Sequence, residues 1–300
     1  MTLQTALDQL AARHPDHLLG VAVNDVISGA TLAALHADQP FQLASVFKIP
    51  VLVATMRQVD AGRLDLDARH ALTGAHRLIG SGVLAALDVG LQPTLRDLLT
   101  LMIVISDNTA TDMILGLIGG PLAVDRAMRD LDIANLHIHH DTRALLHAVF
   151  PADVVLISDA ELAAYAIAHN LPRHDERIAP EAATNTGTPA ALNALLGKLA
   201  RGECAASTGT ETMLTIMQRQ QYNQRLPKTW PETVVFAHKT GTISDMRADC
   251  GILALPDRKL AISAFARAQN AELPLSPAVQ AAGDALLASV GALIWEHLQE

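Results

Sequence analysis

Two residues at the start of an apolar stretch, Ser45 and Lys48, have the types and the spacing for nucleophilic chemistry. Positions i and i+3 lie on the same face of a helix, so the Lys48 amine can stand beside the Ser45 hydroxyl. A serine hydroxyl is a weak nucleophile until a neighbouring base takes its proton. A lysine can be that base when burial or a second cation lowers its pKa. Alone, the pair is weak evidence, because this spacing occurs in many helices.

The element that must position this pair is a buried helix. Residues 49–56 are almost all apolar, which predicts a helix buried on nearly all sides that ends near Ala61 and Gly62. Pro50 fits only close to the start of that helix, where no backbone hydrogen bond is lost. The free N–H groups and the dipole at a helix start favour developing negative charge. The sequence therefore places a hydroxyl and an amine where such charge is stabilised.

Two further short motifs stand in suitable structural contexts. Ser-Asp-Asn at 106–108 separates a predicted helix over 95–105 from another over 108–117. Lys-Thr-Gly at 239–241 ends an apolar run over 234–237. With these three motifs in this order, the chain resembles the class A β-lactamase and serine DD-peptidase superfamily.

The resemblance extends over nearly the whole chain. Residues 185–191, Asn-Thr-Gly-Thr-Pro-Ala-Ala, are similar to the family's D-T-T-T-P-A-A entry into a helix, with Asn for Asp. Residues 198–203, Lys-Leu-Ala-Arg-Gly-Glu, are similar to its K-L-L-x-G-E exit.

The resemblance implies how the catalytic work is divided. Ser45 would be the acylated nucleophile, Lys48 its general base, and Ser106 the group that carries a proton to the leaving nitrogen. The backbone N–H groups of Ser45 and Thr242 would form the oxyanion hole.

The resemblance also implies which residues bind the substrate. Asn108 would hold the side-chain amide of the substrate, and Lys239 and Thr240 would meet its carboxylate. Arg247, eight positions after Lys239, would add a guanidinium suited to bidentate capture of that carboxylate. Lys239 is also a candidate for the second cation near the general base. Asp107 we interpret as structural, anchoring its loop.

The match to the class A β-lactamases fails in one loop. Their E-x-x-L-N motif carries the glutamate that activates the deacylating water, and it has no clear counterpart here. Glu181 keeps the spacing to Asn185 but lacks the leucine, and Glu176 and Asp175 are the alternatives. Three functions stay open: a hydrolase that opens β-lactam rings through Ser45, which we favour, a DD-peptidase or esterase on the same scaffold, and a slow-turnover penicillin-binding sensor. The altered loop separates them, because it controls deacylation and not acylation.

Composition restricts the remaining classes of function. A net charge of −9 without a basic cluster argues against a nucleic-acid surface. No apolar run reaches the roughly 18 residues that span a bilayer. The start of the chain shows no secretory signal, so the compartment stays open between the cytoplasm and secretion with the signal removed. We expect two buried free thiols at Cys204 and Cys250. We also expect a monomer without a cofactor that acts on a small molecule, a β-lactam or a D-Ala-D-Ala-like peptide.

Two other stretches suggest chemistry at first sight. His137, His139, His140 and Asp141 are metal-ligand types, but metal sites need ligands that converge from several elements, so we interpret them as a polar surface loop. Gly-Ser-Gly at 80–82 lacks the lysine and the strand of a phosphate loop, and we interpret it as a turn at the rim of the site.

The periodicity of the chain predicts an α/β fold. β-rich segments occur near both ends of the chain, at 18–26, 30–35, 233–239, 248–255 and 260–267. Helical patterns at 3–13 and 276–299 flank these segments. We therefore predict a five-stranded antiparallel sheet flanked by the terminal helices, with an inserted all-α domain.

The change of periodicity also predicts the domain boundaries. Residues 1–56 and 206–300 would form the discontinuous sheet domain, and residues 57–205 the inserted helical domain. A further helix is expected over 153–170. The active site would lie in the cleft between the two domains.

Overall fold

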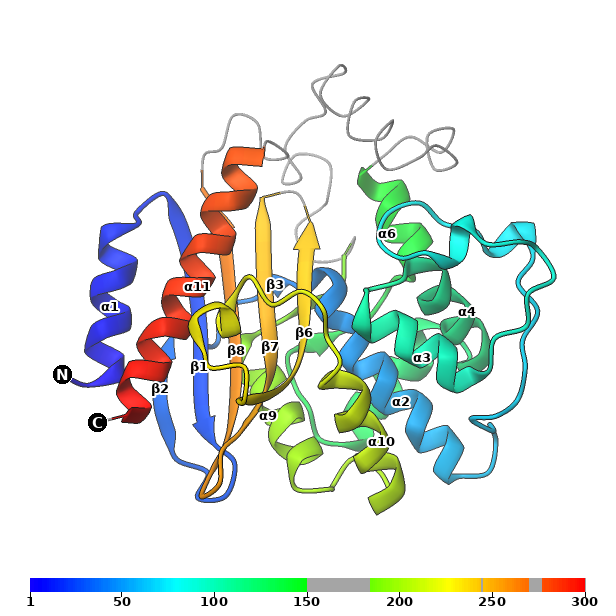
Figure 1. Cartoon of the computed structure of the whole chain (residues 1–300), viewed down its shortest axis with the longest axis horizontal. Coiled ribbons are helices and arrows are strands. Elements are labelled where there is room, and N and C mark those ends of the chain that lie inside the picture. The colour runs from blue at the N-terminus through cyan, green and yellow to red at the C-terminus, as the bar shows by residue number, and fades with distance from the viewer. Residues whose placement is uncertain (150–183, 244, 270–276, 300) are drawn as a thin grey trace.

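A five-stranded antiparallel sheet occupies the centre of the computed structural model, which describes residues 1–149, 184–243, 245–269 and 277–299 (Figure 1). The strand order is β2-β1-β8-β7-β6. The strands are β1 (His17–Asp25), β2 (Thr31–Leu35), β6 (Val235–Ile243), β7 (Met246–Ala254) and β8 (Lys259–Ala268). β1 pairs with β8 along its whole length, so the N-terminal hairpin and the C-terminal strands share one sheet. The predicted fold class is confirmed.

The two terminal helices, α1 (Leu3–Arg13) and α11 (Pro277–Gln299), cover one face of this sheet (Figure 1). Their apolar side chains share one cluster with residues of the strands; among the helix residues are Leu3, Leu7, Leu10, Leu286, Leu287, Val290 and Ile294. By length and composition alone, α11 is apolar enough to cross a membrane. In this structure it packs against β7, β8 and α1, as a core helix does.

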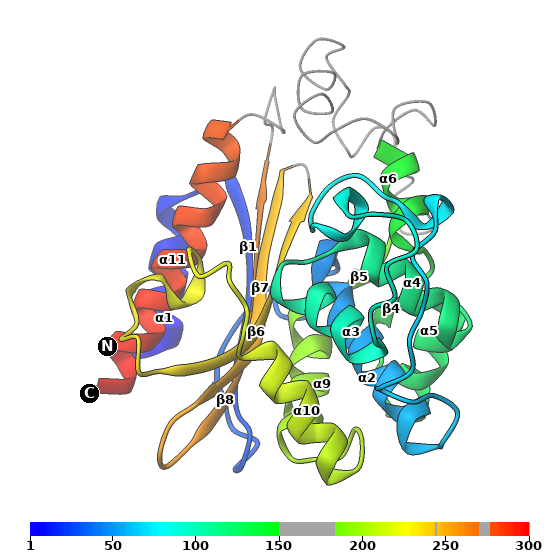
Figure 2. The same ribbon diagram turned by 45° about the vertical axis from the view of Figure 1, so that its right-hand side comes forward.

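The other face of the sheet carries a second apolar cluster built around α2 (Lys48–Asp60) (Figure 2). The first nine residues of α2, Lys48–Met56, are all buried, which confirms the predicted burial on nearly all sides. The surrounding helices are α3 (Leu95–Val104), α4 (Asn108–Ile118), α5 (Pro121–Asp130), α6 (Thr142–Val149), α9 (Pro189–Ala200) and α10 (Ser207–Met217).

Short polar signals set the ends of these helices. At the start of α3, Thr94 and Asp97 form a capping box, in which each side chain accepts the backbone N–H of the other residue. Asp107 caps α4 by accepting the Ala110 N–H, and Gly119 ends α4 in the left-handed conformation with φ of 95°. These signals explain why both predicted helices end within one residue of the observed ones.

A small second sheet was not predicted. It contains β3 (Phe41–Gln42), β5 (Thr186–Gly187) and β4 (Leu136–His137), in the order β3-β5-β4. Strands of two residues are too short to show a period of two in the sequence. The short 3₁₀ helices are η1 (Ala44–Phe47), η2 (Gly74–His76), η3 (Leu84–Ala86) and η5 (Leu226–Thr229).

β6 is longer than the predicted strand over 233–239. It continues to Ile243, so the whole Lys-Thr-Gly motif lies inside the strand. The predicted β-rich run ended at Lys239, but Lys239 pairs with Cys250 of β7 and the pairing continues to Ile243 and Met246. β6 pairs with β7 alone among the described strands, so it is an edge strand of the sheet.

The domain division at residues 56 and 206 stays a prediction. α9, which that division assigns to the helical domain, packs against β8 and β1 of the central sheet. The helix expected over 153–170 lies outside the described residues.

Candidate active site

Ser45 lies on the 3₁₀ helix η1, which leads directly into α2. The sequence predicted one continuous helix here. The difference has a local cause, because Ala44 has a φ of 43°, a left-handed conformation that costs a non-glycine residue on the order of 1–3 kcal/mol. The turn is anchored by the Leu43 N–H, which donates to the Asn185 carbonyl at 2.9 Å. Strain of this kind is typical of functional sites.

Gly241 of the Lys-Thr-Gly motif lets β6 approach the Ser45 turn. A Cβ atom at this position would lie 2.9 Å from the Leu43 carbonyl oxygen and 3.0 Å from a methyl carbon of Val46. Only a residue without a side chain allows this contact. The third residue of the motif therefore lets the strand pack against the turn that carries Ser45.

Lys48 is completely buried at the start of α2 and lies against the turn that carries Ser106. Its Nζ donates to the Ser106 carbonyl at 2.7 Å, to the Ser106 Oγ at 3.1 Å and to the Asn108 Oδ1 at 2.9 Å. Burial lowers the pKa of Lys48 from 10.5 to about 7, although the carboxylates of Asp107 and Asp112 oppose the shift. Among the described residues, Ser106 and Asn108, and not Ser45, hold the amine by hydrogen bonds.

Ser106 sits in a strained turn that Asp107 anchors. Ser106 has a φ of 59°, and the buried Asp107 carboxylate accepts the backbone N–H groups of Val83 at 2.7 Å and Leu84 at 2.8 Å. Gly82 makes this possible, because a Cβ there would come within 2.3 Å of that carboxylate. The geometry agrees with the structural interpretation of Asp107.

Asn108 uses its amide within the protein. Its Oδ1 accepts the Lys48 amine, and its Nδ2 donates to the Ile79 carbonyl at 3.0 Å. The Asn108 N–H donates to the Ser81 carbonyl, so the turn at 80–82 forms one rim of the site. The predicted contact of Asn108 with a substrate amide stays a prediction.

Lys239 is also completely buried, and its Nζ donates to the Thr240 carbonyl at 2.7 Å. Burial lowers the pKa of Lys239 well below its usual value, and the Lys48 amine and the Arg225 guanidinium lower it further. The sequence analysis expected Lys239 to be the second cation that lowers the pKa of Lys48. Burial is the largest cause of the lowered pKa of both lysines, and the repulsion between the two amines adds to it.

A cleft of about 320 Å³ brings most of the predicted residues together. Its lining includes five of them: Ser45, Ser106, Thr240, Thr242 and Arg247. It also includes residues that the sequence analysis missed: Tyr222, Gln224, Arg225, Gln280 and Asp284. A larger hollow of about 910 Å³ lies at the far end of α2 and contains none of the predicted residues.

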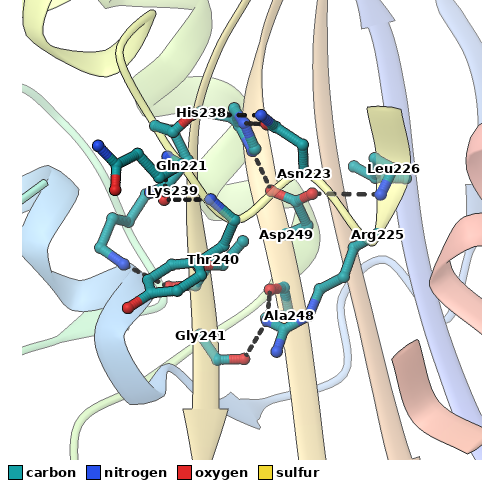
Figure 3. A network of polar contacts seen from close by, with 12 residues as sticks. Gln221, Asn223, Arg225, Leu226, His238, Lys239, Thr240, Gly241, Ala248 and Asp249 are labelled. Carbon is teal, nitrogen blue, oxygen red and sulfur yellow. Dashed lines mark hydrogen bonds and ion pairs between the residues drawn. The ribbon is translucent and has the colours of Figure 1, made fainter. Parts of the chain in front are cut away.

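Arg225 is the most notable of the missed residues (Figure 3). Its Nη1 donates to the Gly241 and Ala248 carbonyls, both at 2.7 Å, and its Nη2 donates to the Thr242 Oγ1 at 2.6 Å. Its Nε pairs with the Asp284 carboxylate of α11 at 2.7 Å. No motif surrounds Arg225 in the sequence, and its partners are at least 16 residues away, so no local signal could have identified it.

Arg247 lies deeper than the sequence suggested. Its side chain is 1% exposed, its Nη1 donates to the Met246 carbonyl, and its Nε is 3.7 Å from the Asp284 carboxylate. Burial and the neighbouring Arg225 lower the pKa of Arg247 to about 10. Two guanidinium groups therefore lie beside the Asp284 carboxylate at this end of the cleft.

Three residues named as candidate deacylation bases, Asp175, Glu176 and Glu181, lie outside the described residues. The oxyanion hole from the N–H groups of Ser45 and Thr242 stays a prediction. The rings of His137 and His139 stack 5.9 Å apart. In the described part of the chain, no three His, Cys, Asp or Glu side chains gather as a metal site would require.

Comparison with known proteins agrees with these motifs. The beta-lactamase enzyme family matches residues 2–298. The beta-lactamase regulatory protein BlaB of Streptomyces cacaoi is 27% identical over 312 residues, which cover 96% of each chain.

Solved structures give the same result. A mutant of PBP-A, in an acyl-enzyme complex with penicillin G, is 25% identical with a TM-score of 0.78, covering 99% of this chain and 96% of that one. A β-lactamase from Sphaerobacter thermophilus is 24% identical with a TM-score of 0.77, covering 97% and 95%, and supports the fold. Because the family match extends over almost the whole sequence, this chain belongs to the beta-lactamase enzyme family of serine hydrolases.

Proposed function

We propose that this protein is a serine hydrolase that opens β-lactam rings through an acyl-enzyme on Ser45. The observation that carries the proposal is Lys48, one turn after the serine, completely buried and with a pKa of about 7. A lysine with that pKa is partly neutral at physiological pH and can take a proton from a hydroxyl.

The geometry supports a sequence of proton transfers. The Ser45 hydroxyl attacks the β-lactam carbonyl and gives its proton to the neutral Lys48 amine, while the N–H groups of Ser45 and Thr242 stabilise the oxyanion. Lys48 then passes a proton to the Ser106 hydroxyl, 3.1 Å from its Nζ, and Ser106 protonates the leaving ring nitrogen. The C–N bond breaks and an ester on Ser45 remains.

The experiment that tests the proposal is a time course of penicillin G hydrolysis by the purified protein. Consumption of several equivalents of penicillin, with the ring-opened acid as product, supports a hydrolase. Inertness toward penicillin together with cleavage of a D-Ala-D-Ala peptide would replace the proposal with a peptidase.

A second candidate, a penicillin sensor with slow turnover, is favoured by one observation. Among the described residues that line the cleft, Asp284 supplies the carboxylate, and it is paired with Arg225. That carboxylate is poorly placed to activate a water at the Ser45 ester. The name of the Streptomyces relative, a regulatory protein, and the acyl-enzyme of PBP-A agree with a long-lived adduct.

We expect deacylation to limit turnover, so a rapid burst of about one equivalent should precede a slow steady state with penicillin G. Losing a deacylation base typically slows that step by roughly 10²–10⁴-fold, whereas acylation keeps all of its groups. Stopped-flow measurement of ring opening checks this. Glu181→Gln should deepen the defect if Glu181 acts as the base. Fast turnover without a burst, unchanged by Glu181→Gln, would point to Asp175 or Glu176.

We expect Arg247→Ala to weaken only substrates that carry a carboxylate. A hydrogen bond to a charged group contributes about 1.5–3 kcal/mol, so kcat/KM for penicillin G should fall roughly 10- to 100-fold. The kcat/KM for a neutral nitrophenyl ester should stay nearly constant, and Arg247→Lys should recover part of the penicillin activity. Equal losses for both substrates would show that Arg247 is structural, as its 1% exposure allows.

A further inference from the structure

The segment that follows α10, residues 220–226, makes hydrogen bonds to the end of α3 and to the strands β6 and β7. Figure 3 shows the bonds of Asn223, Arg225 and Leu226 on the strand side. On one side it contacts three successive carbonyls at the end of α3, just before Ser106. These bonds run from Gln220 Nε2 to Ile103 at 2.8 Å, from Gln221 N to Val104 at 3.2 Å and from Tyr222 Oη to Ile105 at 3.3 Å. Carbonyls at the end of a helix have no partner within the helix, so this segment satisfies groups that would otherwise need water.

On the other side the same segment contacts the two strands β6 and β7. The bonds join Asn223 Oδ1 to His238 Nε2 at 3.0 Å, Arg225 to the Gly241 and Ala248 carbonyls and the Thr242 hydroxyl, and the Leu226 N–H to Asp249 Oδ2 at 3.2 Å. Asp249 is fully buried and also binds His238 Nδ1 at 2.7 Å. These seven residues therefore connect the end of α3, next to Ser106, to the strands β6 and β7, which include the Lys-Thr-Gly motif.

The segment is ordered by its own contacts. Gln220 is 4% exposed, and its Oε1 accepts the N–H groups of Gln221 at 2.9 Å and Tyr222 at 3.0 Å. The oxygen of the Gln220 amide thus stabilises the turn at residues 220–222, while its nitrogen binds the Ile103 carbonyl. The two ends of the segment, Gln220 and Arg225–Leu226, are buried, and the exposed residues 221–224 between them are held by these hydrogen bonds.

We propose that residues 220–226 are a clamp that fixes the distance between Ser106 and the β6–β7 wall, with Gln220 as a positioning residue. Ser106 has the strained φ of 59° and holds the Lys48 amine through both its carbonyl and its hydroxyl. A strained turn persists only where its surroundings determine it, and the clamp binds the three residues before it. This role rests on the proposed function: the clamp keeps the proton-transfer groups at the right distance from the residues that bind the carboxylate of the same substrate.

The test compares Gln220→Met, Asn223→Ala and the double variant with wild type. Gln218→Met, at an exposed position at the end of α10, is the matched control. Two readouts are taken on the full chain: hydrogen exchange of the Asp107 and Asn108 amides, and the rate of Ser45 acylation by penicillin G at saturation. Each single variant loses at least one hydrogen bond of about 0.5–1.5 kcal/mol, which should raise exchange and lower acylation by at least roughly 2- to 10-fold. KM for penicillin should change less than about twofold.

Non-additivity is the decisive result. Both variants weaken the same clamp, so the effect of the double variant should be smaller than the product of the two single effects in both readouts. Multiplied effects, or amide exchange at Asp107 and Asn108 that Asn223→Ala leaves unchanged, would overturn the proposal. Hydrogen exchange does not depend on reactivity toward β-lactams, so failure of the proposed function would appear separately, as absence of acylation in the wild type.

Discussion

Ser45→Ala is expected to abolish covalent labelling by penicillin G while the protein stays folded. In the proposed mechanism this hydroxyl forms the ester, and it lies on η1, which leads directly into the start of α2 and Lys48. Ser45 is only partly buried, so its loss should change the melting temperature little. Intact-mass spectrometry after incubation with penicillin, together with a thermal melt, checks both statements.

The two other serines of the cleft provide matched controls. Ser81→Ala should label like the wild type, since Ser81 lies on the rim. Ser106→Ala should label more slowly but to completion, because Ser106 transfers a proton and does not carry the acyl group. Labelling that survives Ser45→Ala and disappears with either control would move the nucleophile to that residue.

Lys48→Ala is expected to slow acylation of Ser45 by roughly 10²–10⁴-fold, the usual range for loss of a general base. Lys48→Arg separates the base from its charge, because a guanidinium stays protonated and cannot accept a proton. It should be about as slow as Lys48→Ala. Lys228→Ala, an exposed lysine on η5, should have no effect. A loss below tenfold, or full activity in Lys48→Arg, would assign the base to another group.

The acylation rate should rise with pH through about 7 and then level off. The folded-state pKa of Lys48 lies near 7, below its usual 10.5, and the neutral form is the active base. Below that pKa the neutral fraction falls about tenfold per pH unit, and above it nearly every molecule is competent. Single-turnover acylation measured across this range checks the midpoint. A midpoint near 10 would show that burial does not set the reactivity of this amine.

The candidate catalytic residues could be identified from the sequence because their signals are local. Ser45 and Lys48 are one helical turn apart, and Lys239, Thr240 and Gly241 are consecutive, so neighbouring residues in the sequence remain neighbours in the site. The fold followed from the change between helical and strand periodicity, which long elements such as α11 and β8 show clearly.

The residues that hold the site together could not be predicted. Gln220 contacts Ile103, which is 117 positions away in the sequence. Arg225 binds the Gly241 and Ala248 carbonyls, which come together only when β6 and β7 have paired. Backbone carbonyls have no sequence signature, so a side chain that binds them resembles any surface glutamine or arginine. The left-handed turn at Ala44 was equally hidden, because alanine gives no sign of a positive φ.

Peptide mapping of the wild-type protein trapped with penicillin G tests the central claim most directly. Ring opening by Ser45 releases no leaving group, so the adduct should add the mass of the whole penicillin to the peptide that contains Ser45, and it should decay slowly after a rapid rise. An adduct confined to any other residue, with Ser45 unmodified throughout the time course, would contradict the account.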